Sequence, residues 1–228
     1  MTDIATTDLY EVFDTESSTG SLALPAGTSL LVTAPDSGGR VFIEGRLGEG
    51  IGDSDRRLVI TTDDAAGTVV DRVAAAAGVE TSAVTDSLHV IDCQTDQVNP
   101  DTDDSIVTQN VDTPRNLTDI GIGFKEAFDE FERADAERIR VGILSLSVIL
   151  TYVDRETVYR FCQTLTRALQ QDSAIGFFLL TATAHDEETI NTLRRALDGA
   201  VEVRDEDGLS ARVVGLDTVP SDWHTFGQ

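Results

Sequence analysis

Five short apolar runs alternate with helix-like segments along the chain, and this alternation restricts the fold more than any other feature of the sequence. Continuous apolar runs of this kind are typical of parallel strands that helices cover on both faces. The pattern therefore predicts an α/β fold, namely a three-layer, doubly wound and mostly parallel sheet. The runs are Leu30–Thr33, Leu58–Thr62, Leu88–Asp92, Ile139–Leu146 and Ile175–Leu180.

Segments of helical periodicity fill the intervals between these runs. Their apolar residues recur at spacings of three and four, which places them on one face of a helix. Aspartates that precede two of the segments are suited to accept hydrogen bonds from the first free backbone N–H groups of a helix. We expect helices from Val41 to about Glu49, over Ala65–Ala77 and Leu117–Arg133, and after caps at Asp154 and Asp186.

A single domain accounts for most of the chain. The 228 residues suffice for one well-buried core. We assign residues 22–216 to this domain, with a polar segment 1–21 before it and a tail 217–228 after it. Residues 1–28 are expected to be loosely ordered and to lie against the domain. Residues 201–216 contain two apolar runs around an Asp-Gly turn, which predicts a C-terminal β-hairpin. The segment Gln94–Asn116 lacks periodicity, so we expect a mobile loop 94–116.

The charge balance is strongly acidic. The chain has 41 acidic and 17 basic residues, a formal net charge of −24, and Lys125 is its single lysine. Such a carboxylate-dense surface is typical of halophilic proteins, which stay hydrated in a salt-rich cytosol; the alternative is an acidic face for a basic partner. Nucleic-acid binding needs clustered basic residues, so this composition argues against a nucleic-acid partner.

The sequence indicates a soluble, cytoplasmic protein without a membrane partner. The first ten residues contain two aspartates and lack the apolar core of a signal peptide. The longest uncharged apolar run, Val141–Val153, is too short to span a bilayer. Cys93 and Cys162 lie in apolar contexts without metal-site or disulfide spacing, so we expect buried free thiols.

A strand–turn–helix stretch from Ser29 to Gly50 has the frame of a phosphate-binding P-loop, G-x-x-x-x-G-K-[ST]. The second glycine of that pattern is present at Gly39. The first glycine is replaced by Ala34, the lysine by Arg40 and the magnesium-binding hydroxyl by Val41. The candidate nucleotide-binding residues of this degenerate loop are Pro35, Asp36, Ser37, Gly38, Gly39, Arg40 and Val41.

With this order of elements, the chain resembles a RecA-superfamily core, and within it the KaiC-like and RadA-like proteins common in haloarchaea. The resemblance covers about residues 22–216 and implies a RecA/KaiC-type sheet and ATP as the ligand. The segments that carry it, besides the loop, are LVITTDDA, RIRVGILSLSVILTYVDRETVYRF and TAHDEETINTLRRALDGAVEVR.

Several positions that the resemblance equates with functional residues have changed type. The Walker B aspartate position is Leu144 and the magnesium hydroxyl position is Val41, so no Mg²⁺ site is expected. Arg40 keeps the positive charge of the P-loop lysine, but a guanidinium is a planar fork and not a point charge. Walker A and Walker B are therefore both degenerate, and ATP as a cofactor is in doubt.

Two further pairs of residues fall on functional positions of that family. Asp63 and Asp64 occupy the place of the catalytic glutamate pair, and Thr181 and His185 occupy a sensor-like position that faces the γ-phosphate. Each pair has a structural alternative. The aspartates would also suit the start of the following helix, and His185 would also suit a surface loop. In the same way, the two glycines of the loop would suit a plain turn.

Two other regions have structural interpretations. His89 lies within a strand, where a histidine is more often a core or edge residue than a ligand. Trp223 and His224 are expected to dock on the domain or on a neighbouring subunit.

The favoured function is that of a pseudo-ATPase: a catalytically degenerate RecA/KaiC-like domain of a halophile that regulates or scaffolds other proteins. The resemblance implies partners of the same kind, in a homo-oligomer or a hetero-oligomer with RecA/KaiC-like relatives. One alternative is a nucleotide-binding protein or slow, divergent ATPase that uses Arg40 and either Asp63 or Asp64. Another is a recombination accessory protein.

Overall fold

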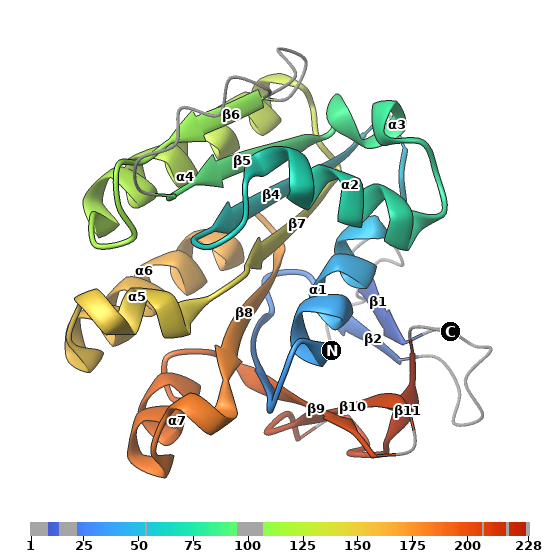
Figure 1. The fold of residues 1–228 in the computed structure, drawn as a ribbon. Helices are drawn as coiled ribbons and strands as arrows, with labels where there is room; N and C mark the ends of the chain where they lie inside the picture. Colours follow the sequence, from blue (N-terminus) through green and yellow to red (C-terminus); the bar gives the residue numbers. More distant parts are fainter. Residues whose placement is uncertain are drawn as a thin grey trace.

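A mostly parallel sheet forms the centre of the molecule (Figure 1). The computed structural model describes residues 9–13, 22–52, 54–94, 107–206, 208–217 and 219–226. Within these residues the sheet has nine strands in the order β11-β10-β9-β3-β8-β7-β4-β5-β6. In chain order they are β3 (Ser29–Ala34), β4 (Asp55–Thr61), β5 (Leu88–Asp92), β6 (Val107–Asn110), β7 (Arg138–Ile143), β8 (Ile175–Thr181), β9 (Gly199–Asp205), β10 (Leu209–Val214) and β11 (His224–Thr225).

The strand pairing confirms the predicted parallel sheet and the C-terminal hairpin. Strand β3 pairs in parallel with both β8 and β9, and β4 pairs in parallel with both β5 and β7. Strand β10 pairs antiparallel with β9 and with β11. The parallel strands therefore bring the carboxyl ends of β3, β8, β7 and β4 to one edge of the sheet, where open α/β sheets bind ligands.

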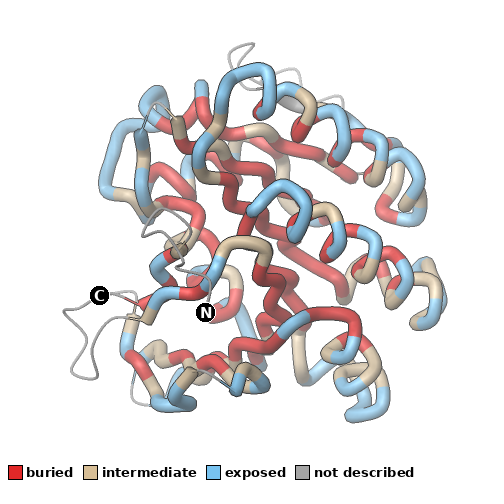
Figure 2. The backbone as a smooth tube through the Cα atoms, turned by 180° about the vertical axis from the view of Figure 1, so that it is seen from behind, coloured by how far each residue is buried: buried red, intermediate tan, exposed pale blue. Residues whose placement is uncertain are grey.

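Helices cover both faces of the sheet and complete the three layers. The apolar residues form two buried clusters, one on each face, and Figure 2 shows the buried positions concentrated along the strands. On one face lie α1 (Gly38–Gly48), α2 (Ala66–Ala77) and α3 (Thr81–Thr85). On the other lie α4 (Leu117–Arg133), α5 (Leu146–Tyr152), α6 (Arg155–Gln171) and α7 (Glu187–Arg194), with a short 3-10 turn η2 (Ala182–Ala184) before α7.

The predicted helix caps at Asp154 and Asp186 are present. Asp154 accepts a hydrogen bond from the Thr157 N–H, and Asp186 accepts one from the Thr189 N–H. The hydrogen bond from the Thr157 N–H lowers the pKa of Asp154, because it stabilises the ionised carboxylate. Helix α2 ends at Ala77 and is capped by Gly78, whose φ of 68° is the left-handed conformation that favours glycine.

The start of the chain is more ordered than its composition indicates. Residues 9–13 and 22–25 form an antiparallel pair, β1 (Leu9–Phe13) and β2 (Leu22–Pro25), where the sequence predicted a loosely ordered segment. The Tyr10 hydroxyl accepts a hydrogen bond from the Ile139 N–H and donates one to the Ser173 carbonyl. These contacts to residues far along the chain order β1, and no local pattern encodes them.

Part of the expected loop 94–116 is a strand. β6 pairs in parallel with β5 at the edge of the sheet, and Val111 after it is buried. The segment Val107–Asn110 contains one apolar residue, which is too weak a signal for a strand, and its pairing with β5 makes it one. The rest of the expected loop from residue 95 to residue 106 lies outside the described residues.

The predicted strand Ile139–Leu146 is shorter in the structure. It ends at Ile143, because the Ser145 hydroxyl accepts a hydrogen bond from the Val148 N–H and starts α5. The tail docks on the domain, one of the two predicted outcomes: His224 stacks on Phe13 with ring centroids 4.3 Å apart. Both cysteines are buried free thiols, as predicted. Across the described residues, no helix is long and apolar enough to span a membrane.

Candidate functional site

At the turn between β3 and α1, a side chain of the turn itself binds the backbone N–H that a phosphate loop would offer to a ligand. Pro35, Asp36 and Ser37 form the whole connection, and α1 begins at Gly38. The Gly38 N–H donates to Oδ1 of Asp36 at 2.9 Å. A free N–H at a helix start attracts anions, and here the anion is a carboxylate of the same turn.

The first two residues of α1, Gly38 and Gly39, lie close to the sheet. A Cβ on Gly39 would lie 2.6 Å from Cδ1 of Leu179 and 2.8 Å from Cβ of Ala34. A Cβ on Gly38 would lie 2.8 Å from Cδ2 of Leu209. Neither glycine has a positive φ. The structure thus explains Gly39 by the close approach of α1 to β3 and β8, whereas the atom nearest to a Cβ on Gly38 is the movable end of the Leu209 side chain. The packing at Gly39 differs from the conformational freedom that the sequence suggested.

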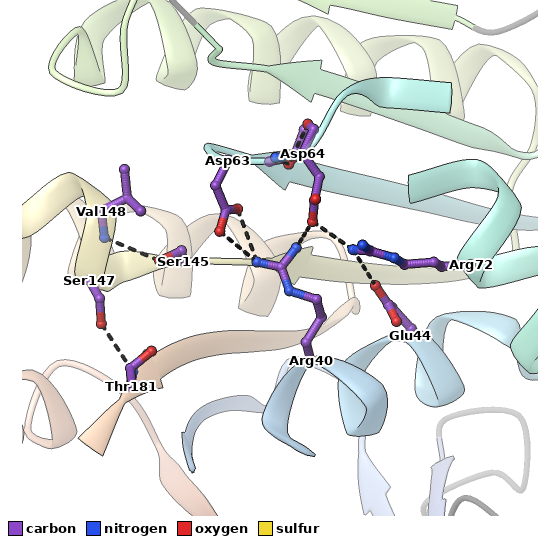
Figure 3. Close-up of polar contacts among 10 residues, drawn as sticks. Arg40, Glu44, Asp63, Asp64, Arg72, Ser145, Ser147, Val148 and Thr181 are labelled. Carbon is purple, nitrogen blue, oxygen red and sulfur yellow. Dashed lines mark hydrogen bonds and ion pairs between the residues drawn. The ribbon is translucent and has the colours of Figure 1, made fainter. Parts of the chain in front are cut away.

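Arg40 is held by the two aspartates that follow β4 (Figure 3). Its Nη2 donates to both carboxylate oxygens of Asp63 at 3.0 and 2.8 Å, and its Nη1 donates to Oδ2 of Asp64. Burial opposes the charge on Arg40, but the bond to Asp63 and the attraction of both aspartates outweigh it and raise the pKa of the guanidinium. We name Arg40, Asp63 and Asp64 the arginine clamp.

A second arginine extends the clamp towards the middle of α1. Nη1 of Arg72 on α2 lies 2.7 Å from Oδ2 of Asp64 and 3.7 Å from Oε1 of Glu44. Glu44 is buried, and its Oε1 has no hydrogen-bond partner among the described residues. Burial raises the pKa of Glu44, and the attraction of Arg72 and Arg40 opposes that rise. Charged groups from α1, α2 and the β4–α2 turn therefore form one network.

The proposed capping role of Asp63 and Asp64 is wrong. The Ala66 N–H at the start of α2 donates to Oδ2 of Asp92, which stands at the end of the neighbouring strand β5. The Asp64 N–H donates a hydrogen bond to the Thr61 hydroxyl, and this hydroxyl donates one to the Asp64 carbonyl. Neither aspartate side chain caps α2: both carboxylates bind Arg40, and that of Asp64 also binds Arg72 of α2.

The positions equated with metal anchors lack ligand atoms. Leu144 is fully buried in the core beneath α1 and α2. Val41 is 39% exposed, but its side chain is an aliphatic group that does not coordinate a metal. In the part of the chain that the structure describes, no cluster of three or more His, Cys, Asp or Glu side chains is placed to hold a metal ion.

The sensor-like residues bind to the start of α5. The Thr181 N–H donates to the Ser147 hydroxyl at 3.0 Å, and Nε2 of His185 lies 2.9 Å from the same hydroxyl. Burial lowers the pKa of His185, although Asp186 partly opposes this effect. Ser147 thus links the end of β8 to α5. Figure 3 shows Thr181 and Ser147 at the same edge of the sheet as the arginine clamp.

His89 packs inside the domain, as its strand position indicated. Its ring meets Phe131 of α4 edge-on at 4.7 Å, and Nδ1 lies 3.5 Å from Oε2 of Glu130. Burial lowers the pKa of His89. These contacts explain the histidine without a ligand.

Sequence reasoning gave no role to four residues of the site: Glu44, Arg72, Asp92 and Ser147. Glu44 follows Arg40 by four residues, a spacing that places both on one helix face. Asp92 ends a predicted strand at the same sheet edge as Asp63, so it was a candidate for that edge. The roles of Arg72 and Ser147 depend on which strands are neighbours, and the local pattern does not contain that information.

Comparison with known proteins gives one family. A family model described as a family of unknown function (DUF7504) matches residues 27–203. The match runs from the turn before β3 into β9 and includes all residues of the arginine clamp. No curated protein matches the chain.

Proposed function

Because the chain belongs to DUF7504, a family of unknown function, we propose its role from its own site: a pseudo-ATPase that regulates or scaffolds other proteins. In this proposal the domain is a RecA/KaiC-like core that has lost phosphoryl transfer. It acts through its surface, in a homo-oligomer or with RecA/KaiC-like relatives. The acidic composition supports a halophilic, cytoplasmic setting.

The observation that carries the proposal is the arginine clamp. A triphosphate at the β3–α1 turn would need the positive charge of Arg40, which Asp63 and Asp64 already neutralise. It would also need the Gly38 N–H, which Asp36 occupies. A polyphosphate would therefore have to displace three carboxylates and then lie close to them, and like charges at such distances repel strongly.

The magnesium ion that P-loop chemistry requires does not fit this site. Phosphoryl transfer in P-loop enzymes depends on positioning and on charge neutralisation around the metal. Val41 and Leu144 offer no oxygen atom at the two anchor positions, and Leu144 is fully buried. We therefore derive no hydrolytic step for this protein, and the slow ATPase becomes the disfavoured alternative.

Calorimetric titration of ATP, with and without Mg²⁺, in multi-molar KCl tests the proposal. Wild-type protein is expected to give no heat of binding under either condition and no release of phosphate from ATP. The Asp63→Asn/Asp64→Asn variant removes the charges that neutralise Arg40, and we expect it to remain inactive in hydrolysis because the metal anchors are still absent.

Hydrolysis of ATP by the wild type that Arg40→Ala abolishes would overturn the proposal. Metal-independent binding of ATP that Arg40→Ala abolishes would instead make the protein a nucleotide-responsive switch. A matched control is Arg46→Ala on the same helix, because Arg46 bonds to the Val12 carbonyl and lies outside the clamp.

A further inference from the structure

The end of the chain adds a strand to the sheet in the manner of a bound peptide. Strand β11 consists of His224 and Thr225, which pair antiparallel with residues 210–211 of β10. The Phe226 N–H continues this pairing, because it donates to the Leu209 carbonyl at 3.0 Å. Figure 1 shows β11 beside β10 at the end of the sheet. Strand addition is a recurring mode of peptide recognition, in which main-chain bonds give affinity and side-chain contacts give specificity.

Two ring contacts fix the inner side of this added segment. The ring of His224 stacks on Phe13 of β1 with centroids 4.3 Å apart, and Phe226 meets Phe42 of α1 edge-on at 5.4 Å. Phe13 and Phe42 are buried, and so is His224. The segment therefore covers apolar surface that β1 and α1 present beside the edge of β10.

Trp223 is held between two arginines. Its ring centroid lies 4.0 Å from Cζ of Arg204 on β9 and 4.7 Å from Cζ of Arg212 on β10. Nε and Nη2 of Arg212 also donate to Oε2 of Glu202 at 2.9 and 2.7 Å. This ion pair engages the N–H groups of the guanidinium and leaves its planar face for the indole. We name the parts that receive the segment the tail site: the edge of β10, Phe13, Phe42, Arg204 and Arg212.

The connection between β10 and β11 makes fewer contacts than the segment that it carries. Leu216 and Val219 pack on the domain, and the Val219 N–H donates to the Leu216 carbonyl. Among the described residues of the tail, the ring contacts all belong to residues 223–226. Residues 215–223 would span at most about 30 Å when extended, which is enough to reach a neighbouring molecule. The exposed residues of the connection include Asp217, Pro220, Ser221 and Asp222.

We propose that the tail site binds the segment Trp223–Phe226 of a second copy of the chain in place of its own, so that an exchange of tails joins two copies. The side chains that fit the site are those of this segment, which determines the occupant. The contacts are the same before and after the exchange, and exchange of an identical element is a low-cost route to a dimer. This inference rests on the proposed function, since it names the contact by which the homo-oligomer would form.

Salt sets the conditions under which two copies can meet. Each copy has a formal net charge of −24, so two copies repel each other at low salt. At about 1 M salt the screening length is about 3 Å, and this repulsion is confined to groups in contact. The aromatic contacts of the tail site do not depend on unscreened charge. The exchange is therefore expected in about 1 M KCl.

The first experiment uses the fact that Trp223 is the single tryptophan of the chain. The full-length variant Trp223→Ala/Phe226→Ala has no tryptophan and has lost two anchors of its own tail. A synthetic peptide of residues 217–228 then supplies the one indole in the sample, and its fluorescence anisotropy and emission wavelength report binding in about 1 M KCl. We expect the peptide to bind with a shift of the emission to shorter wavelength, because the indole leaves water.

Matched controls test whether this binding takes place at the tail site. A peptide with the order of residues 223–226 scrambled keeps the tryptophan and is expected to bind at least about tenfold more weakly. Arg204→Ala/Arg212→Ala, added to the tryptophan-free variant, is expected to weaken binding of the tail peptide to the same extent. Arg194→Ala is the control for the loss of an arginine bound to Glu202, since Arg194 bonds to Oε1 of Glu202 and makes no contact with Trp223 among the described contacts. It is expected to leave binding unchanged.

The second experiment measures the oligomeric state by light scattering after gel filtration. The wild type is expected to form dimers in about 1 M KCl, and an excess of the tail peptide is expected to lower the dimer fraction. Trp223→Ala/Phe226→Ala is expected to be monomeric. Circular dichroism checks that the variants fold, and Phe226→Ala alone, which keeps Trp223, is the milder second variant.

Three results would overturn the inference: no binding of the tail peptide to the tryptophan-free variant, equal binding of the scrambled peptide, or a wild type that stays monomeric. Dimers that persist in folded Trp223→Ala/Phe226→Ala would also overturn it, because the copies would then be joined elsewhere. ATP hydrolysis is measured separately. Hydrolysis that Arg40→Ala abolishes would refute the pseudo-ATPase proposal without affecting the tail exchange, and a monomeric wild type without hydrolysis would refute the exchange alone.

Discussion

The residue types at the site decide which contacts its side chains make. The resemblance equated Arg40, Asp63 and Asp64 with functional positions of a nucleotide site, and the structure brings the three together at the carboxyl edge of the sheet. Their contact with one another was not predictable, because each residue was interpreted as a contact of a bound nucleotide and not as a contact of the other two. A guanidinium satisfies two carboxylates at once through its planar fork, whereas a lysine offers a single charged nitrogen.

The pH dependence of folding should reveal the burial of Glu44. Burial raises its pKa above the ordinary value of 4.5, and the charged groups that face it are Arg72, Arg40 and Asp64. The folded protein then binds the Glu44 proton more tightly than the unfolded chain does. The stability due to this group is present below pH 4.5 and is lost as the pH rises through the folded-state pKa.

Urea unfolding of wild type and Glu44→Gln across this pH range measures the effect. The free energy of unfolding of the wild type, relative to that of the variant, is expected to fall as the pH rises above 4.5. The exposed Glu156→Gln controls for the loss of one negative charge. A relative stability that rises with pH would show that Arg72 holds Glu44 ionised in the folded protein.

At the scale of helices and strands, the sequence predicted elements with their own periodicity and missed those that depend on neighbours. Helix α4 lies where its apolar spacing placed it, and β5 has the predicted bounds. Strands β1 and β6 were missed because they are short and become strands only by pairing. Helix α5 was missed because its apolar residues continue those of β7, and only the Ser145 cap separates the two.

The close approach of α1 to the sheet predicts a strong effect at Gly39. Gly39→Ala places a Cβ against Leu179 and Ala34, and overpacking of this kind costs about 1–3 kcal/mol. Gly45→Ala on the same helix meets no atom within 4 Å and is expected to stabilise the protein by up to about 1 kcal/mol. Urea unfolding measures both, and equal effects of the two variants would contradict the packing explanation of Gly39.

At the scale of the whole molecule, the net charge of −24 sets the dependence of folding on salt. Acidic side chains repel one another over about 10 Å at 0.1 M salt, and over about 3 Å at 1 M. The repulsion destabilises the compact state more than the expanded one. Ion pairs between exposed groups are weakened by the same salt, but they contribute little to begin with.

The thermal midpoint of unfolding is therefore expected to rise as KCl increases from 0.1 M to about 1 M, the range over which the screening length falls from about 10 to about 3 Å. Circular dichroism measures the midpoint, and sucrose at matched osmolality controls for the general effect of excluded solutes. A thermal midpoint that rises in KCl but not in sucrose would assign the effect to screening of the acidic surface. A midpoint that is unchanged or lower in KCl would mean that the attractive pairs, including the arginine clamp, outweigh the repulsion, and the halophilic interpretation of the composition would then lose its physical basis.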